Sequence, residues 1–507
     1  MSNKPVRVRF APSPTGPLHM GGVRTALYNY LFAKKNNGTF ILRIEDTDQT
    51  RFVEGTQEYI IDALNWCGIS PDEGPGIAGN HGPYIQSERK SMYPKYAEEL
   101  IEKGWAYYAF DTAEELDAMR EQAKSMKMPN WQYNSITRSS MKNSLTLPAD
   151  DVNARIANGE PYVIRFKMPR NTDVRFEDVI RGWVVVNTNN LDDKVLYKSD
   201  GMPTYHLANI VDDHTMEISH VIRGEEWLPS APLHVLLYEA FGWDCPKFAH
   251  LPLLLRPDGN GKLSKRDGDR LGFPVFPTDW TTSEGELYSG YREKGYFPGA
   301  FINMLAFLGW NPGTPQEIFS LDELVASFSL ERVAKAGAKF DAEKTRWFQQ
   351  QYLRATSDEI LADELALLID GNYDKTFLTA VCRLMKERAT FISDIPKEGD
   401  YFFTEPREYD EKTLRKKWKE DTTEIMSSWS NKLATLEQFS TENIEQSFKQ
   451  YLEDINKGIG AVLPAFRLLL TGKGMGPSMF EICALLGKEE SIQRMDKGIV
   501  KIQELIK

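Results

Sequence analysis

Two short segments far apart in the chain combine residue types that can hold phosphate groups. The first, Arg9 to Gly22, is rich in proline and glycine and contains His19, and the second, Lys262 to Arg266, carries two lysines. A strand-like run leads into the first segment and a helix-like run follows it, which would bring backbone N–H groups and a helix N-terminus up to a phosphate. The imidazole and the two ammonium groups can stabilise charge that develops there. We therefore expect the two segments to form one nucleotide-activating site.

Activation of a carboxylic acid by ATP needs in-line attack on the α-phosphorus and release of pyrophosphate, so the protein mainly positions groups and stabilises charge. His19 suits hydrogen bonds to phosphate oxygens, and Lys262 and Lys265 suit the charge on the α-phosphate and the leaving pyrophosphate. Glycines on both sides of the lysines are consistent with a loop that closes over ATP. Each feature alone has a plainer explanation, because proline–glycine turns and solvated basic loops are common.

Two arginines at the ends of predicted strands, Arg9 and Arg223, are candidates for binding the substrate. A guanidinium is a planar fork that matches a carboxylate, and two of them in one pocket would select an acidic side chain. Glu45 follows another predicted strand and could bind the ammonium group of an amino acid. The alternative for Glu45 is an ion pair with Arg43 or Arg51.

A further segment offers polar groups beside the substrate, because Tyr205 and Asn209 can both form hydrogen bonds there. The same segment contains possible metal ligands, but their spacing is not a strong ligand pattern, and we expect no protein-bound metal. These are His206, Asp212, Asp213 and His214.

Length and composition indicate a soluble, globular protein. The chain has 507 residues, of which 41% are hydrophobic and 26% charged, which allows roughly three to five domains. Four scattered cysteines without a CxxC pair fit a reducing compartment. We find no apolar signal segment and no run of the roughly 20 apolar residues that a membrane span needs. We therefore expect a cytoplasmic protein with no membrane partner.

The net charge of −12 argues mildly against a nucleic-acid partner, since phosphates favour basic surfaces. A local basic patch can nevertheless bind RNA. The run from Lys412 to Lys419, with an aromatic residue inside it, is one candidate. Its plainer explanation is a solvated helix face.

The pattern of elements changes along the chain. Residues 1 to about 110 alternate strand and helix signals, and the pattern resumes after about 195. Between them, strand-like segments at 162–166, 174–176 and 183–186 indicate an insertion. From about 335 the chain is predicted to be nearly all helix, including helices over 375–391 and 441–455, with a break at 394–408.

In this order, the motifs resemble those of glutamyl-tRNA synthetase of the bacterial type, a class I aminoacyl-tRNA synthetase. Besides the two phosphate-binding segments, the resemblance includes Arg43 to Asp48, Phe176 to Gly182, Pro203 to Asn209, Val221 to Leu228 and Glu331 to Gly337.

The resemblance implies a fold: an α/β Rossmann-type catalytic domain with an inserted α+β acceptor-stem domain, followed by an all-α anticodon-binding region. On this interpretation the catalytic domain occupies 1–110 and 196–255, with the insertion at 111–195. A stem-contact domain with the lysine loop follows at 256–334. The helical region occupies 335–507 and divides near 395–405.

The resemblance also implies roles for individual residues. Glutamate would be bound by Arg9, Ala11, Ser13, Glu45, Tyr205, Asn209 and Arg223. ATP would be bound by His19, Gly21, Gly22, Lys262, Leu263, Ser264 and Lys265, with His19 and the two lysines as the catalytic groups. Mg²⁺ would arrive with ATP. Some relatives carry zinc in the insertion, but Tyr107 to Asp111 contains no cysteine, so we expect none.

The implied reaction joins glutamate to tRNA-Glu through a glutamyl-adenylate, and we expect a monomer. The chain departs from the signatures of the class, because Gly22 stands where a second histidine is common and Leu263 and Arg266 replace methionine and serine. Three alternatives remain: glutaminyl-tRNA synthetase, a truncated paralogue that modifies a tRNA base, and a non-catalytic RNA-binding protein derived from the family. The truncated paralogue lacks a long tail such as this one.

Overall fold

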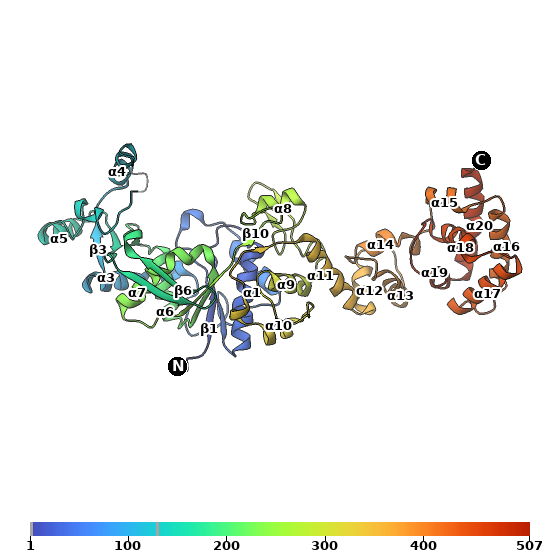
Figure 1. Cartoon of the computed structure of the whole chain (residues 1–507), viewed down its shortest axis with the longest axis horizontal. Coiled ribbons are helices and arrows are strands. Elements are labelled where there is room, and N and C mark those ends of the chain that lie inside the picture. Colours follow the sequence, from blue (N-terminus) through green and yellow to red (C-terminus); the bar gives the residue numbers. More distant parts are fainter. Residues whose placement is uncertain (1–3, 128–130, 507) are drawn as a thin grey trace. The chain divides into compact units, whose positions relative to one another are not determined.

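The computed structural model describes residues 4–127 and 131–506, except for the side chains of Lys265 and Asp269. It divides into two compact units. The first extends to Lys294 and includes Pro298–Thr345, and the second consists of Gly295–Phe297 and the chain from Arg346 onward. Figure 1 labels the elements of both units, which are described separately below.

A parallel sheet forms the centre of the first unit. Strand β1 (Arg7–Phe10) pairs in parallel with β2 (Thr39–Leu42), and α1 (Met20–Lys35) connects them. Strand β8 (His220–Gly224) pairs in parallel with β9 (Lys247–Leu251), and α7 (Ala231–Phe241) connects these two. The two pairs adjoin, because the N–H of Ser219 donates to the carbonyl of Arg7 at 2.9 Å. Every residue of β1 is buried, as expected for a parallel strand covered on both faces.

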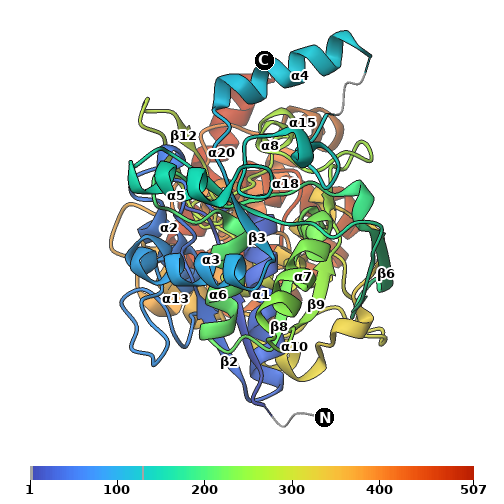
Figure 2. The ribbon, with the colours of Figure 1, turned by 90° about the vertical axis from the view of Figure 1, so that its left-hand side faces the viewer.

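An antiparallel hairpin extends this sheet. Strands β5 (Asp173–Asp178) and β6 (Gly182–Asn187) pair with each other, and β5 lies parallel to β9, so the strand order is β6-β5-β9-β8. Figure 2 shows β6 at one edge. The sequence interpretation placed this hairpin within the insertion, yet its backbone pairs with β9 of the central sheet.

A separate antiparallel sheet forms the rest of the inserted segment. It has the order β3-β4-β7 and consists of β3 (Ala106–Ala109), β4 (Val163–Phe166) and β7 (Val195–Tyr197). Helices α4 (Ala113–Ser125) and α5 (Ala149–Ala157) lie between β3 and β4 in the chain. Helix α4 begins with a capping box, in which Thr112 and Glu115 each bind the other's backbone N–H.

The remaining elements of the first unit surround the central sheet. Its helices are α2 (Thr56–Trp66), α3 (Tyr93–Glu102), α6 (Tyr205–Thr215), α8 (Lys265–Leu271), α9 (Pro298–Phe307) and α10 (Leu321–Ser327). Its short strands are β10 (Leu254–Leu255), which pairs with β13 (Ala338–Lys339), and β11 (Trp280–Thr281), which pairs with β12 (Leu287–Tyr288).

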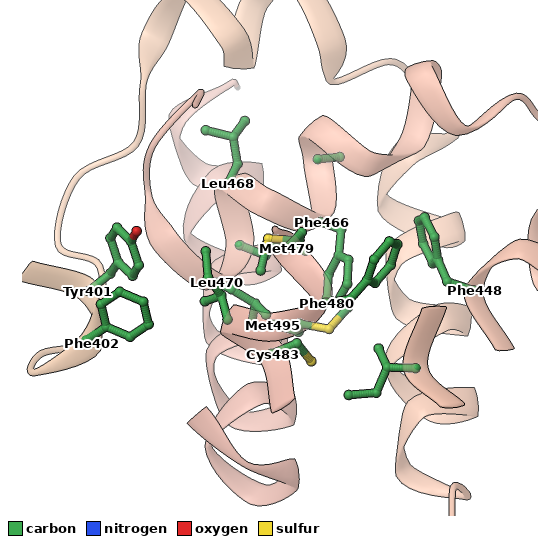
Figure 3. Close-up of a cluster of buried hydrophobic side chains, with 14 of the residues drawn as sticks. Tyr401, Phe402, Phe448, Phe466, Leu468, Leu470, Met479, Phe480, Cys483 and Met495 are labelled. Atoms are coloured by element: carbon green, nitrogen blue, oxygen red, sulfur yellow. The ribbon is translucent and has the colours of Figure 1, made fainter. Parts of the chain in front are cut away.

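The second unit is built from helices around an aromatic core. The helices after α11 (Ala342–Ala355) are α12 (Asp358–Ala366), α13 (Lys375–Met385), α14 (Asp394–Glu398), α15 (Glu411–Lys417), α16 (Thr422–Ala434), α17 (Thr441–Asp454), α18 (Ile459–Thr471), α19 (Met479–Leu486) and α20 (Lys488–Leu505). In the core, Phe448 from α17 packs against Phe466 from α18 and Phe480 from α19, with ring centroids 5.5 and 5.8 Å away (Figure 3).

Helix α13 ends six residues before the position predicted from its apolar periodicity, at Met385 instead of residue 391. The backbone N–H groups of Thr390 and Phe391 donate to the carboxylate of Asp394, at 3.0 and 2.8 Å. A side chain of the following segment thus takes donors that a continued helix would use internally.

Candidate active site

One cavity of about 830 Å³ lies at the carboxyl ends of β1 and β8, where parallel sheets bind ligands. It brings together nearly all the residues that the sequence proposed. Lining residues from that set are Arg9, Ala11, Ser13, His19, Gly21, Gly22, Glu45, Tyr205, Arg223, Lys262, Leu263 and Ser264. Asn209 does not line it but lies behind Arg9, and the side chain of Lys265 is outside the described part of the chain.

Arg9 is held from behind by α6. Its Nε and Nη2 donate to the two carboxylate oxygens of Asp213 at 2.9 and 3.2 Å, and Nη2 also donates to Asn209 at 3.1 Å. Burial by itself would lower the pKa of Arg9, but the Asp213 carboxylate outweighs it and raises the pKa above its ordinary value. The positive charge of Arg9 is therefore already matched by a protein carboxylate.

Arg43 completes a buried charge cluster with the same carboxylate. Its Nη1 donates to Asp213 at 2.7 Å, and its Nη2 donates to Glu45 at 2.8 Å and to Asn209 at 3.1 Å. Burial raises the pKa of Glu45, against the opposing effect of Arg43. The ion-pair alternative for Glu45 is thus present with Arg43, whereas Arg51 pairs with Asp48.

Sequence reasoning offered Arg43 as an ion-pair partner of Glu45 but missed its contact with Asp213, and treated Asp213 only as a weak metal candidate. A usable signal was present, because Asn209 and Asp213 are four residues apart and therefore share one face of α6. Polar side chains that share the buried face of a helix indicate buried hydrogen-bond partners.

Arg223 has a different environment, because it is 5% exposed and forms no ion pair with any described residue. Its Nη1 donates to the hydroxyl of Tyr205 at 3.0 Å and to Nδ1 of His234 at 3.3 Å, and its Nε donates to Nε2 of His250 at 3.1 Å. A fourth contact runs from Nη2 to the carbonyl of Trp227 at 3.4 Å. All of these acceptors are neutral.

The charges at the end of the cavity where Arg9 and Arg223 lie can now be compared. Arg9 and Arg43 are matched by Asp213 and Glu45, whereas Arg223 has no counter-charge among the residues described. A buried cation without a partner is costly in free energy, and an anionic ligand relieves that cost. The arrangement is suited to a ligand with a carboxylate.

His19 caps the first turn of α1. Its Nδ1 accepts the backbone N–H of Gly21 at 3.0 Å, so its proton is carried on Nε2. The surrounding protein atoms and the nearby Lys262 lower the pKa of His19, although the ring is open to the cavity. His19 can thus donate one neutral hydrogen bond to a ligand.

The two glycines after His19 leave no space for side chains. A Cβ on Gly21 would lie 2.8 Å from Cε1 of His19, and one on Gly22 would lie 2.4 Å from Cδ1 of Leu18. A side chain at position 22 would therefore require the Leu18 side chain to shift.

The lysine loop reaches the cavity from the other side. The ammonium group of Lys262 lies 3.4 Å from Oε1 of Glu226, and both side chains are about half exposed. Ser264 precedes α8, where its N–H and hydroxyl both donate to Asp267, at 3.0 and 2.6 Å. Lys265 is the first residue of α8.

Three further findings concern metals, RNA and membranes. No group of three or more histidine, cysteine, aspartate or glutamate side chains that could hold a metal occurs in residues 4–127 and 131–506. In the Lys412–Lys419 patch, Trp418 is 7% exposed and so cannot stack on a base, whereas Lys412 and Lys416 are exposed. No helix in the described ranges is long and apolar enough to cross a membrane.

Family models match nearly the whole chain. Residues 5–347 match the catalytic domain of the class I tRNA synthetases (E and Q), and residues 348–499 match an anticodon binding domain.

Curated relatives match over their full length. A glutamate–tRNA ligase of Cytophaga hutchinsonii is 54% identical over 512 residues, covering 100% of this chain and 99% of that protein. One of Flavobacterium johnsoniae is 58% identical, covering 98% and 99%. The crystal structure of a glutamate tRNA ligase from Elizabethkingia meningosepticum, in complex with its amino acid, aligns with a TM-score of 0.96 at 51% identity, covering 98% of this chain and all of that one.

Proposed function

This chain belongs to the glutamate–tRNA ligases, which are class I tRNA synthetases, and from this premise we propose how its residues perform the reaction. It is a ligase that attaches glutamate to tRNA in protein synthesis, and its family uses ATP for this step. The predicted fold class, a class I catalytic domain followed by a helical anticodon-binding region, is confirmed. The curated relatives that match the full length of the chain are named glutamate–tRNA ligases, which favours neither the glutaminyl nor the non-catalytic alternative.

We propose that Arg223 binds the side-chain carboxylate of glutamate. The observation that carries this proposal is a buried guanidinium whose described contacts are all neutral. Arg9 contributes its Nη1, which forms no hydrogen bond with a described residue, while Asp213 and Asn209 hold its other nitrogens. Glu45 receives the substrate ammonium group on the carboxylate oxygen that Arg43 does not use.

Residues that line the cavity would supply the remaining contacts to glutamate. We assign these to Ala11, Ser13 and Tyr205, all of which line the cavity, with Asn209 acting through Arg9. Tyr205 packs against Trp227 with ring centroids 4.2 Å apart and the rings tilted by 31°, and its hydroxyl accepts from Arg223.

For ATP, we propose that the phosphates lie at the N-terminus of α1. The Nε2–H of His19 would donate to a phosphate oxygen, and the positive end of the α1 dipole would favour the phosphate charge. Gly21 and Gly22, whose N–H groups are capped by His19, would line the phosphate site without side chains. Lys262 would exchange Glu226 for a phosphate, and Lys265 would join it, with Leu263 and Ser264 forming the wall of the cavity. Mg²⁺ would be held by the phosphate oxygens, since no cluster of three suitable side chains occurs in the described ranges.

The chemistry proceeds in two transfers. An oxygen of the glutamate α-carboxylate attacks the α-phosphorus, the bond to the bridging oxygen breaks, and pyrophosphate leaves with the electron pair. A ribose hydroxyl of the terminal adenosine of tRNA-Glu, the 2′-hydroxyl by family resemblance, then attacks the acyl carbon and releases AMP. His19 and the lysines act by stabilising charge on phosphorus-bound oxygens.

We also propose roles for two further parts of the chain, and a location and oligomeric state for the enzyme. The segment 111–195 contacts the acceptor stem, and the region from 335 onward binds the anticodon arm. The enzyme acts as a cytoplasmic monomer.

The proposal for Arg223 is tested by Arg223→Ala. Loss of one partner of a desolvated charge pair costs about 2–5 kcal/mol, so we expect the KM for glutamate to rise about 30-fold or more while the KM for ATP changes little. Arg175→Ala, which removes an arginine on an exposed face of β5, is the matched control. An unchanged KM for glutamate in Arg223→Ala would reject the assignment.

A further inference from the structure

Two neutral imidazole rings contact the guanidinium of Arg223, and a third lies behind one of them; none of the three is among the residues predicted to bind glutamate or ATP. His250, at the end of β9, accepts from Nε, and His234, on α7, accepts from Nη1. His206, on α6, lies directly behind His234, with its Nδ1 3.2 Å from Nε2 of His234. His234 and His250 are both completely buried.

The hydrogen bonds fix where each ring carries its proton. A guanidinium can only donate, so Nε2 of His250 and Nδ1 of His234 must both be unprotonated. His250 therefore carries its proton on Nδ1 and donates it to Asp178 at 2.6 Å. His234 carries its proton on Nε2 and donates it to His206. Both rings are held in one neutral tautomer by a partner on their far side.

The contrast with Arg9 shows what this arrangement achieves. Arg9 is oriented by a carboxylate, Asp213, which also neutralises it. Arg223 is oriented as firmly, with four of its five N–H groups bound, but by groups that carry no charge. The nearest carboxylate in this network, Asp178, is one imidazole away.

We infer that His234 and His250 are positioning residues that determine specificity, because they orient Arg223 while leaving its charge available for the substrate. This inference rests on the proposed role of Arg223 in binding glutamate. A carboxylate in place of either ring would orient the guanidinium equally well but would compete with the substrate. The neutral amide of glutamine gains little from an uncompensated charge, so the imidazoles favour glutamate over glutamine.

A matched pair of variants at His234 separates orientation from charge. In His234→Asn the amide oxygen takes the place of Nδ1 as a neutral acceptor, and in His234→Asp an oxygen of the same reach carries a charge. A charge at this distance changes proton affinities by about 1–3 pKa units. We therefore expect His234→Asp to raise the KM for glutamate about 10-fold or more relative to His234→Asn, with kcat and the KM for ATP less affected.

The assay is aminoacylation of tRNA-Glu by the full-length enzyme, with glutamine as a competitive inhibitor. In His234→Asp the inhibition constant of glutamine divided by the KM of glutamate should fall by the same factor, because only glutamate binding is weakened. His220→Asn and His220→Asp, at a half-buried histidine on β8 that faces Ser219 and Phe32, provide the control pair. They should not differ in glutamate kinetics.

The outcomes are distinct. Equal glutamate kinetics in His234→Asn and His234→Asp would overturn the inference, because charge at position 234 would then have no effect. An equal loss of glutamate affinity in both variants together with a raised KM for ATP would also overturn it. If Arg223→Ala also leaves glutamate binding unchanged, the proposed glutamate site fails as well. If Arg223→Ala is impaired but His234→Asp is not, only the inference fails.

A measurement on the unmodified enzyme guards against variants that do not fold. Nitrogen-15 NMR of labelled histidines at pH 7 should show His234 protonated on Nε2 alone and His250 on Nδ1 alone. An imidazolium at either position, or the opposite tautomer, would overturn the inference.

Discussion

The buried carboxylate of Asp213 offers the sharpest test of how the site is held together. It accepts hydrogen bonds from two guanidinium groups, at 2.9 and 3.2 Å from Arg9 and at 2.7 Å from Arg43, and its side chain is fully buried. Asp213→Asn keeps the shape of the side chain but replaces one carboxylate oxygen by an NH₂ group, which then faces the N–H groups of the arginines. Removing one partner of a buried ion pair costs about 3–5 kcal/mol, because the remaining charge stays buried.

The matched control is the same substitution at the surface. Asp244 pairs with Lys4 at 3.0 Å, a similar distance, but its side chain is 89% exposed. Exposed ion pairs contribute about 0–1 kcal/mol, so Asp244→Asn should change stability by less than about 1 kcal/mol. The comparison of Asp213→Asn with Asp244→Asn separates the effect of burial from the effect of ion pairing on stability.

Amide hydrogen exchange measures the effect in the first unit alone, since the two units need not unfold together. For peptides from β1 and α6, a loss of about 3–5 kcal/mol predicts exchange about 150- to 5,000-fold faster, at about 1.36 kcal/mol per factor of ten. Adding Arg9→Met to Asp213→Asn should recover part of the loss, because it removes an uncompensated cation. Strictly additive losses, or a loss no larger than in Asp244→Asn, would refute the reasoning.

Four further predictions address the rest of the chain. Gly21→Ala should displace the capping imidazole, since the new Cβ would lie 2.8 Å from it, and should lower kcat with little change in the KM for glutamate, as steady-state kinetics would show. Lys265→Ala should lower the rate of adenylate formation about 100-fold or more, measured in single turnovers with tRNA present. Replacing Lys412 and Lys416 by glutamine should make the salt dependence of tRNA binding shallower, by about one unit of slope for each phosphate that the variant no longer neutralises. Burial lowers the pKa of His220 from 6.5 to about 4, so the unfolded chain takes up a proton first. This histidine should therefore contribute stability that is complete above pH 6.5 and falls by up to about 3 kcal/mol as the pH drops towards 4, and melting curves of His220→Asn should depend less steeply on pH by that amount.

The parts of the site that depend on local sequence were predictable. The strand, turn and helix that place His19 follow from apolar periodicity and from proline and glycine within a few residues of each other. Arg223 was identified because it ends a strand at the ligand-binding edge of a parallel sheet.

What escaped prediction depends on contacts between distant residues. Arg43 and Asp213 are 170 positions apart, and Asp178 and His250 are 72 apart, so no periodicity connects them. The sequence pattern also made Arg9 and Arg223 equivalent, because it cannot show that only one of them has a protein carboxylate against it.

Strand β5 has a consequence for how this enzyme could be rearranged, by evolution or by design. Asp178, its last residue, belongs to a hairpin that the chain places next to the inserted segment, yet its carboxylate fixes His250 behind Arg223, in the proposed glutamate site. An exchange of 111–195 between relatives would therefore carry part of the amino-acid site with it. Chimaeras that exchange the segment but keep the recipient's β5–β6 hairpin should keep their amino-acid preference, provided that β7, which pairs with β4, is exchanged together with the segment.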